Sequence, residues 1–152
     1  MDIKKVEKDS MDTLRNLLQS YEGEFSAITK KVPDERGVFD LDCNLQVTDN
    51  YLLYREGSPI GFCVKGEEQG VHDIYEFYIV PSQRGGGLGA DFARYIFRNY
   101  PGKWQVRQIQ GADKARDFWR STISKFTGGN YQEEQVSDEY WGVVTRQTFL
   151  SS

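Results

Sequence analysis

Residues 75–100, YEFYIVPSQRGGGLGADFARYIFRNY, constrain the fold more than any other stretch of the chain. The segment before Pro81 is rich in aromatic and β-branched residues, which predicts a strand. Four glycines then fall within five positions, and an amphipathic pattern that begins near Gly87 or Leu88 predicts a helix. A glycine in an ordered element costs roughly 0.5–1 kcal/mol relative to alanine. A loop with four glycines is therefore expected to have a function that requires them.

A glycine loop at the amino end of a helix is typical of an anion site. The first N–H groups of a helix have no intrahelical acceptor, and the helix dipole is positive at that end. Glycines allow a phosphate to approach those amides without interference from a Cβ atom. Arg84, just before the loop, adds a cation. The simpler alternative, a permissive turn with no ligand, stays open at this point.

Two common phosphate motifs fit poorly. A P-loop requires a lysine directly after its glycines, and none follows here. Gly85-x-Gly87-x-x-Ala90 matches the spacing of the dinucleotide-binding fingerprint. However, the next predicted strand, WQVRQIQ, lacks the acidic residue that binds ribose, and several elements precede the unit. A nicotinamide- or ATP-binding domain is thus a disfavoured alternative.

The remaining patterns predict a mixed α/β or α+β chain that forms one domain over residues 1–152. The expected order is one strand, two helices, three strands, a helix, a strand, a helix and two strands. Their expected positions are a strand in 2–8, a helix over 11–21 with a second short helix after Gly23, strands in 51–56, 60–65 and 72–80, a helix after the glycine loop, a strand in 104–109, a helix over 113–127 and strands in 131–136 and 140–150.

The glycine loop and its flanks resemble the GNAT (Gcn5-related N-acetyltransferase) superfamily. The family motif, Arg/Gln-x-x-Gly-x-Gly/Ala between a central strand and a helix, matches Arg84-Gly85-Gly86-Gly87-Leu88-Gly89 after FYIVPSQ. The later stretch ADKARDFWRSTISKFTGGNY resembles the second cofactor-side helix of the family. The expected order of elements also matches the GNAT fold, and several segments look most like a bacterial subgroup.

The resemblance implies an acyl-CoA N-acyltransferase fold, with about seven mostly antiparallel strands, a sheet splayed at its centre and helices on both faces. It implies that acetyl-CoA is the co-substrate and that no metal takes part. The pantetheine arm would pair with backbone groups of Phe77, Tyr78, Ile79 and Val80. The pyrophosphate would lie on the amides of Gly85, Gly86, Gly87, Leu88, Gly89 and Ala90, with Arg84 adding charge and Phe118 contributing from the later helix.

The chemistry that the resemblance implies is direct acetyl transfer to an amine. An ammonium, with a pKa near 10.4 for a lysine-like amine, must first lose a proton, so a carboxylate base is needed. Glu76, in the middle of the apolar strand, is the candidate, because burial would raise its pKa. A solvent-facing or merely structural Glu76 is the alternative. Trp119 stands where the family usually has its acidic tyrosine, which leaves Tyr131, Tyr140 or water for that role.

The composition of the chain limits the classes of molecule that it is expected to bind. A net charge of −4 and a pI near 5.1 disfavour a nucleic-acid binder. Two cysteines without metal spacing, no apolar leader and no apolar run of about 20 residues predict a cytoplasmic protein without a membrane partner. The partners are then acetyl-CoA and an amine acceptor, with a homodimer as one possibility.

The acceptor pocket of the family is lined by segments that are acidic here, which would suit a cationic amine. An acyl-CoA-binding sensor or interaction module with weak catalysis is the alternative function, because Ala112 and Trp119 replace two family residues. The acidic segments carry Tyr21 and the acids Glu22, Glu24, Asp34, Glu35, Glu133, Glu134, Asp138 and Glu139.

Overall fold

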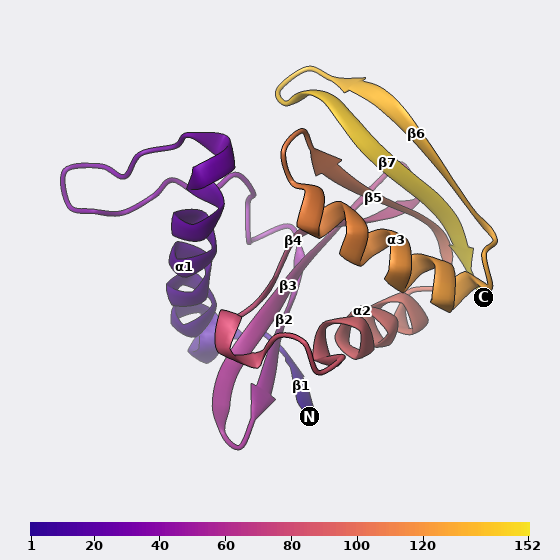
Figure 1. The fold of residues 1–152 in the computed structure, drawn as a ribbon. Coiled ribbons are helices and arrows are strands. Elements are labelled where there is room, and N and C mark those ends of the chain that lie inside the picture. Colours follow the sequence, from indigo (N-terminus) through magenta and orange to yellow (C-terminus); the bar gives the residue numbers. More distant parts are fainter. The chain divides into compact units, whose positions relative to one another are not determined.

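A computed structural model describes all 152 residues as seven strands, three α-helices and two short 3-10 turns. The strands form one sheet in the order β1-β2-β3-β4-β5-β7-β6. The pairs β1/β2, β2/β3, β5/β7 and β6/β7 are antiparallel, whereas β4/β5 is parallel because α2 connects the two strands. The strands are β1 (Asp2–Lys5), β2 (Asp49–Arg55), β3 (Ser58–Glu68), β4 (Val71–Ile79), β5 (Gly102–Ile109), β6 (Tyr131–Asp138) and β7 (Gly142–Ser151), and the helices are α1 (Met11–Thr29), α2 (Leu88–Asn99) and α3 (Asp113–Thr127) (Figure 1).

The chain forms two compact units, and β3 and β4 contribute residues to both. The first unit comprises Met1–Lys65 and Tyr75–Arg84, and the second comprises Gly66–Ile74 and Gly85–Ser152. The first unit holds β1, β2 and α1, and the second holds α2, α3, β5, β6 and β7.

The core of the first unit lies between α1 and its strands. Leu14 and Leu18 are fully buried on α1, four residues apart and therefore on one face of the helix. They pack in one cluster with Phe62 of β3 and Tyr78 of β4. The helix runs without a break through Gly23 and ends at Thr29, and the next residue, Lys30, caps it in a left-handed conformation with φ of 64°. The expected second short helix after Gly23 is therefore wrong: Tyr21 and Phe25 stack across this glycine with ring centroids 5.4 Å apart, and the helix continues in spite of the low helix propensity of glycine.

Strand β3 approaches β4 closely at Gly61. A Cβ atom at this position would lie 2.5 Å from the carbonyl oxygen of Tyr78, so the backbone approach requires glycine. Just beyond the end of β4, the N–H of Val80 donates to the carbonyl of Ile60 over 2.8 Å. These contacts fix the carboxyl end of β4, where the segment that leads to the glycine loop begins.

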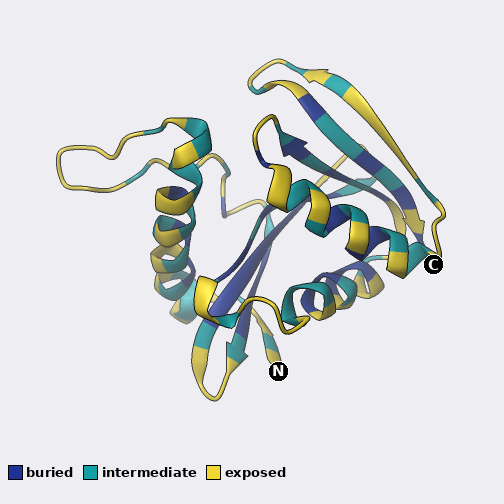
Figure 2. Cartoon of the chain, viewed as in Figure 1, coloured by how far each residue is buried: buried dark blue, intermediate teal, exposed yellow.

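The core of the second unit lies where α2 and α3 meet their strands. Phe97 of α2 makes edge contacts with Trp104 of β5 and Phe149 of β7, with ring centroids 5.0 and 4.9 Å apart. Trp104 stacks on Phe149 at 6.2 Å, and α3 adds the buried side chains of Trp119 and Ile123. Figure 2 shows that the buried residues of α2 and α3 occupy one side of each helix, as the sequence pattern predicts.

The predicted fold class is confirmed: the protein is a mixed α/β chain with a seven-stranded, mostly antiparallel sheet. The predicted bounds of α3, residues 113–127, match the structure. None of the three helices is long and apolar enough to serve as a membrane span.

Candidate functional site

Glu76 is a buried carboxylate in the middle of β4, with only 9% of its surface exposed. Burial raises its pKa from 4.5 to about 8, and a hydrogen bond from the Tyr21 hydroxyl opposes this shift without cancelling it. The negative charges of Glu22 and Asp42 raise the pKa further. Glu76 therefore does not face solvent, and at neutral pH its protonated and ionised forms are both accessible.

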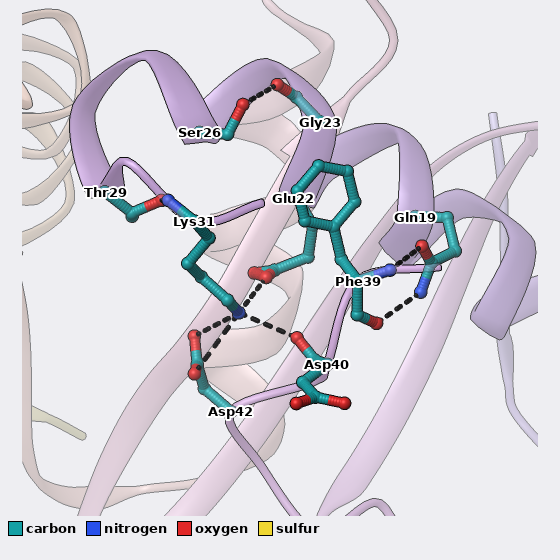
Figure 3. A network of polar contacts seen from close by, with 9 residues as sticks. All are labelled: Gln19, Glu22, Gly23, Ser26, Thr29, Lys31, Phe39, Asp40 and Asp42. Carbon is teal, nitrogen blue, oxygen red and sulfur yellow. Dashed lines mark hydrogen bonds and ion pairs between the residues drawn. The ribbon is translucent and has the colours of Figure 1, made fainter. Parts of the chain in front are cut away.

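Three carboxylates converge at Glu76. Oxygen atoms of Glu22, Asp42 and Glu76 all lie within 4.8 Å of one another, close enough to share a cation. The Lys31 ammonium contacts two of the three: it donates to Glu22 and lies 3.4 Å from both oxygens of Asp42 (Figure 3). It also donates to the carbonyl of Asp40 over 2.7 Å. Lys31 thus partly neutralises the negative charge of this cluster of three carboxylates.

A short loop brings Lys31 and Asp42 together beside α1. The Gln19 side chain accepts from the Phe39 N–H and donates to the Phe39 carbonyl, both over 2.8 Å, which fastens the loop to the helix (Figure 3). Burial raises the pKa of Glu22 although Lys31 lies beside it, while the neighbouring carboxylates raise the pKa of Lys31 against the effect of burial. Neither Lys31 nor Asp42 is expected from the sequence, because TKKVPDERGVFDLDCN has the composition of an ordinary polar loop.

Three aromatic rings contact the ring of Tyr21. It stacks on Phe25 with centroids 5.4 Å apart and makes edge contacts with Phe62 at 5.7 Å and Tyr78 at 5.8 Å. Burial and the adjacent Glu76 carboxylate raise its pKa well above 10, so the phenol stays protonated. Burial also raises the pKa of the neighbouring Cys43 thiol to about 12.

The glycine loop is open and exposed. Gly85 and Gly87 adopt φ of 90° and 85°, which other residues rarely tolerate. A Cβ atom at Gly85, Gly86 or Gly87 would meet no other atom within 4 Å. Gly87 is the N-cap of α2, and the first helical bond runs from Asp91 N–H to Gly87 O over 3.1 Å. The amides of the first turn therefore have no intrahelical acceptor and are available to an anion.

The Arg84 side chain is bound to residues of the first unit. Its guanidinium makes two bonds of 2.9 and 3.1 Å to Glu24 of α1, and its Nε donates to the Ile79 carbonyl over 2.8 Å. It also lies over the Tyr78 ring at 5.5 Å. Arg84 thus connects α1 to the end of β4, and a phosphate contact by Arg84 stays a prediction that requires it to leave Glu24.

No family model matches the chain, and no curated protein matches its sequence. Solved structures do match it along almost its whole length. The ribosomal-protein-S18-alanine N-acetyltransferase of Escherichia coli superimposes with a TM-score of 0.67 at 10% identity, covering 99% of this chain and 94% of that one. A ribosomal-protein-alanine N-acetyltransferase of Brucella melitensis gives 0.64 at 15% identity, with 99% of each chain covered. An aminoglycoside acetyltransferase solved with coenzyme A and kanamycin gives 0.66 at 16% identity, with 97% of this chain and 93% of that one covered.

The chain has the GNAT fold. At these identities the similarity establishes the fold, and each neighbour's substrate is a property of that neighbour.

In this GNAT fold, the position expected for an acidic tyrosine is occupied by a packing residue. Trp119 is 5% exposed and contacts Phe97 at 6.2 Å and Phe118 at 4.9 Å. Tyr140 is 73% exposed and packs against Trp141, and Tyr131 lies at the start of β6. Phe118 is half-buried on α3, where its contact with a cofactor stays a prediction.

Most of the acids expected to line an acceptor pocket bind other groups of the protein. Glu133 pairs with Arg120 and Gln147, and Glu134 pairs with Arg146. Glu22 differs from these acids because it is buried, with 3% of its surface exposed, where it binds Lys31 and lies beside Glu76. The structure thus places the unusual carboxylates beside α1, within the first unit. Glu24 pairs with Arg84, Asp138 with Arg107 and backbone amides, and Asp34 with the amides of its own turn.

The raised pKa of Glu76 predicts a pH-dependent stability. The folded protein holds a proton on Glu76 that the unfolded chain releases above about pH 4.5, so stability is lost as pH rises from there through about 8. Glu76→Gln removes the charge and should raise the free energy of unfolding at pH 9, relative to the wild type, by on the order of 2–4 kcal/mol. At pH 4 the two proteins should be nearly equal.

Urea unfolding at both pH values measures this difference. Glu67→Gln, at an exposed glutamate near the end of β3, is the control and should follow the wild type. Parallel pH profiles for wild type and Glu76→Gln would contradict the assignment of a buried, destabilising charge.

Proposed function

We propose that this protein is an acetyl-CoA-dependent N-acetyltransferase that moves an acetyl group directly to a primary amine of a small molecule or protein. The observation that carries the proposal is Glu76, a buried carboxylate with a pKa of about 8 on the strand that runs into the glycine loop. General bases work best when their pKa lies near the working pH. The GNAT fold supports the proposal at the level of the reaction class.

The glycine loop is proposed to bind the pyrophosphate of acetyl-CoA. The loop supplies backbone amides at the positive end of α2, and its glycines leave the space in front of them open. The carboxyl end of β4, from Phe77 to Val80, is proposed to hold the pantetheine arm by backbone pairing, in the manner of an added strand. No metal is proposed to take part.

Glu76 is proposed to remove the proton from the acceptor ammonium. The amine lone pair becomes available only after this step, and a carboxylate with a pKa of about 8 takes up that proton more readily than an ordinary glutamate does. The adjacent Glu22 and Asp42 carry negative charge that Lys31 only partly cancels, which favours a cationic acceptor.

We also propose that residues 1–152 act as one functional domain and that the protein works in a reducing cytoplasm. Its two cysteines, Cys43 and Cys63, are free thiols, as is usual in that compartment.

A thermal-shift assay combined with a thiol-release assay tests the function. Acetyl-CoA should raise the melting temperature, whereas NAD and ATP should not. A panel of polyamines, aminoglycosides and lysine-containing peptides should then release free coenzyme A at a rate that depends on the amine. Stabilisation by acetyl-CoA without release by any amine would instead support an acyl-CoA-binding sensor, which the buried Trp119 favours.

A further inference from the structure

We propose that Lys31 is an acetylation site of this protein, at which the chain transfers an acetyl group from acetyl-CoA to its own lysine. This inference rests on the proposed acetyl transfer, because it uses the same thioester and the same base, Glu76. It assigns a modification to a residue that lies outside the GNAT motif and outside the strand that carries Glu76.

The backbone of Lys31 is fixed at the point where α1 ends. Lys30 caps the helix in a left-handed conformation with φ of 64°, and the N–H of Lys31 donates to the Thr29 hydroxyl over 3.2 Å. This turn separates the two neighbouring lysine side chains. Lys30 is exposed, and its ammonium donates to the Ala27 carbonyl over 2.8 Å. The Lys31 side chain instead reaches the loop that leads to β2 (Figure 3).

Lys31 carries a primary ammonium that lies one carboxylate away from Glu76. The ammonium donates to Glu22 and lies 3.4 Å from both oxygens of Asp42, and the side chain is 20% exposed. Oxygen atoms of Glu22, Asp42 and Glu76 all lie within 4.8 Å of one another. All four residues belong to the first unit. The amine is therefore held close to the group proposed to take a proton from an acceptor, at a separation that one water can bridge.

An amine fixed in this way has an advantage over an acceptor from solution. Well-oriented groups within one molecule react as though present at roughly 10⁵–10⁸ M. The raised pKa of Lys31 opposes the reaction, because an ammonium has no lone pair. A neighbouring base removes this obstacle, and Glu76 lies in the same cluster. Lys31 is thus expected to accept an acetyl group when Glu76 is ionised.

The transfer balances in atoms and protons. The Lys31 ammonium gives one proton to the Glu76 carboxylate, and the nitrogen lone pair forms the C–N bond at the thioester carbon. The C–S bond breaks, and its electron pair goes to sulfur. The second nitrogen proton and the proton on Glu76 pass to water, and the thiolate takes up one proton from water. The products are Nε-acetylated Lys31, free coenzyme A and one released proton.

The modification changes the charge beside Glu76. An acetylated lysine is neutral, so it cannot form ion pairs with Glu22 and Asp42 as the ammonium does. Glu22, which is 3% exposed, then loses its cation. Acetylation of Lys31 thus leaves the cluster of three carboxylates more negative by one charge.

Mass spectrometry of the full chain and its peptides tests the site, with the adjacent Lys30 as the matched control. During incubation with acetyl-CoA, acetyl groups should accumulate on Lys31 at least about tenfold faster than on Lys30. Acetic anhydride needs no enzyme and should give the reverse order, because Lys30 is exposed and the pKa of Lys31 is raised. Dilution of the protein should leave the fraction of Lys31 modified per minute unchanged, because the transfer occurs within one chain.

Two variants separate self-acetylation from chemical labelling. Lys31→Arg keeps a cation beside Glu22 and removes the acceptor, so the label that acetyl-CoA places at this position should disappear while labelling of Lys30 is unchanged. Glu76→Gln should slow the acetylation of Lys31 by acetyl-CoA about 100-fold or more. Labelling of the same variant by acetic anhydride should stay within about threefold of the wild type, because it requires no base from the protein.

The inference and the proposed function fail differently. If amines of the panel are acetylated and Lys31 is modified no faster than Lys30, self-acetylation alone is overturned. A rate that falls on dilution, or an unchanged rate in Glu76→Gln, overturns it as well. If neither Lys31 nor any amine is acetylated, both are overturned. Acetylation of Lys31 without turnover of any panel amine supports the inference and restricts the observed activity to the chain's own lysine.

Discussion

Gly87→Glu should abolish the stabilisation of this protein by acetyl-CoA. For a ligand at a hundredfold excess over its Kd, the wild type should gain about 2.7 kcal/mol, or roughly 5–10 °C in melting temperature. The variant places a carboxylate at the N-cap of α2. In the wild type, the open space and the free amides at this position favour a bound anion. The negative charge of the introduced carboxylate would repel a pyrophosphate and its side chain would occupy the same space.

The substitution also strains the backbone, since Gly87 has φ of 85°. Gly57→Glu is the matched control: Gly57 has φ of 81° and lies in the turn between β2 and β3, where a Cβ atom would meet no other atom within 4 Å. Both variants should lose similar stability without ligand, and only Gly87→Glu should lose the response to acetyl-CoA. An undiminished response in Gly87→Glu would remove the glycine loop from the binding site.

Glu76→Gln should lower kcat by about 10²- to 10⁴-fold, the usual contribution of a general base. Affinity for acetyl-CoA should stay close to that of the wild type, because glutamine keeps the size of the glutamate side chain. Wild-type kcat/KM should rise with pH as Glu76 loses its proton near pH 8, and this rise should be absent from the variant.

Steady-state rates between pH 6 and 9.5 measure both effects. Glu67→Gln removes an exposed carboxylate near the end of β3 and should reproduce the wild-type profile. A Glu76→Gln enzyme with wild-type rates across this range would exclude Glu76 as the base.

Local patterns predicted most elements of the fold because they depend on neighbouring residues. The aromatic and β-branched residues of β4, the glycines before α2 and the apolar stripe of α3 each specify a structure within a short window. The expected helix break at Gly23 is wrong: by propensity this glycine should end a helix, but Tyr21, which packs against the core, stacks on Phe25 one turn later, and α1 continues as one helix.

The surroundings of Glu76 could be predicted only in part. Its place in an apolar strand predicted burial and a raised pKa, and both are found. Its partners could not be predicted, because Tyr21, Lys31 and Asp42 lie far from it in the sequence and belong to a helix and a polar loop.

By itself, the sequence determined the order of the elements and the strand, glycine loop and helix that are proposed to bind an anion, because backbone conformation and free amides follow from local residues. The tertiary structure alone decided that Lys31 partly neutralises the carboxylates near Glu76, that Arg84 is bound to Glu24, and that the Tyr21 ring packs against Tyr78 of β4. Such pairings arise because the packing of α1 against β3 and β4 brings particular side chains within a few ångströms of one another. The pKa values of these side chains are then set more by burial than by residue type.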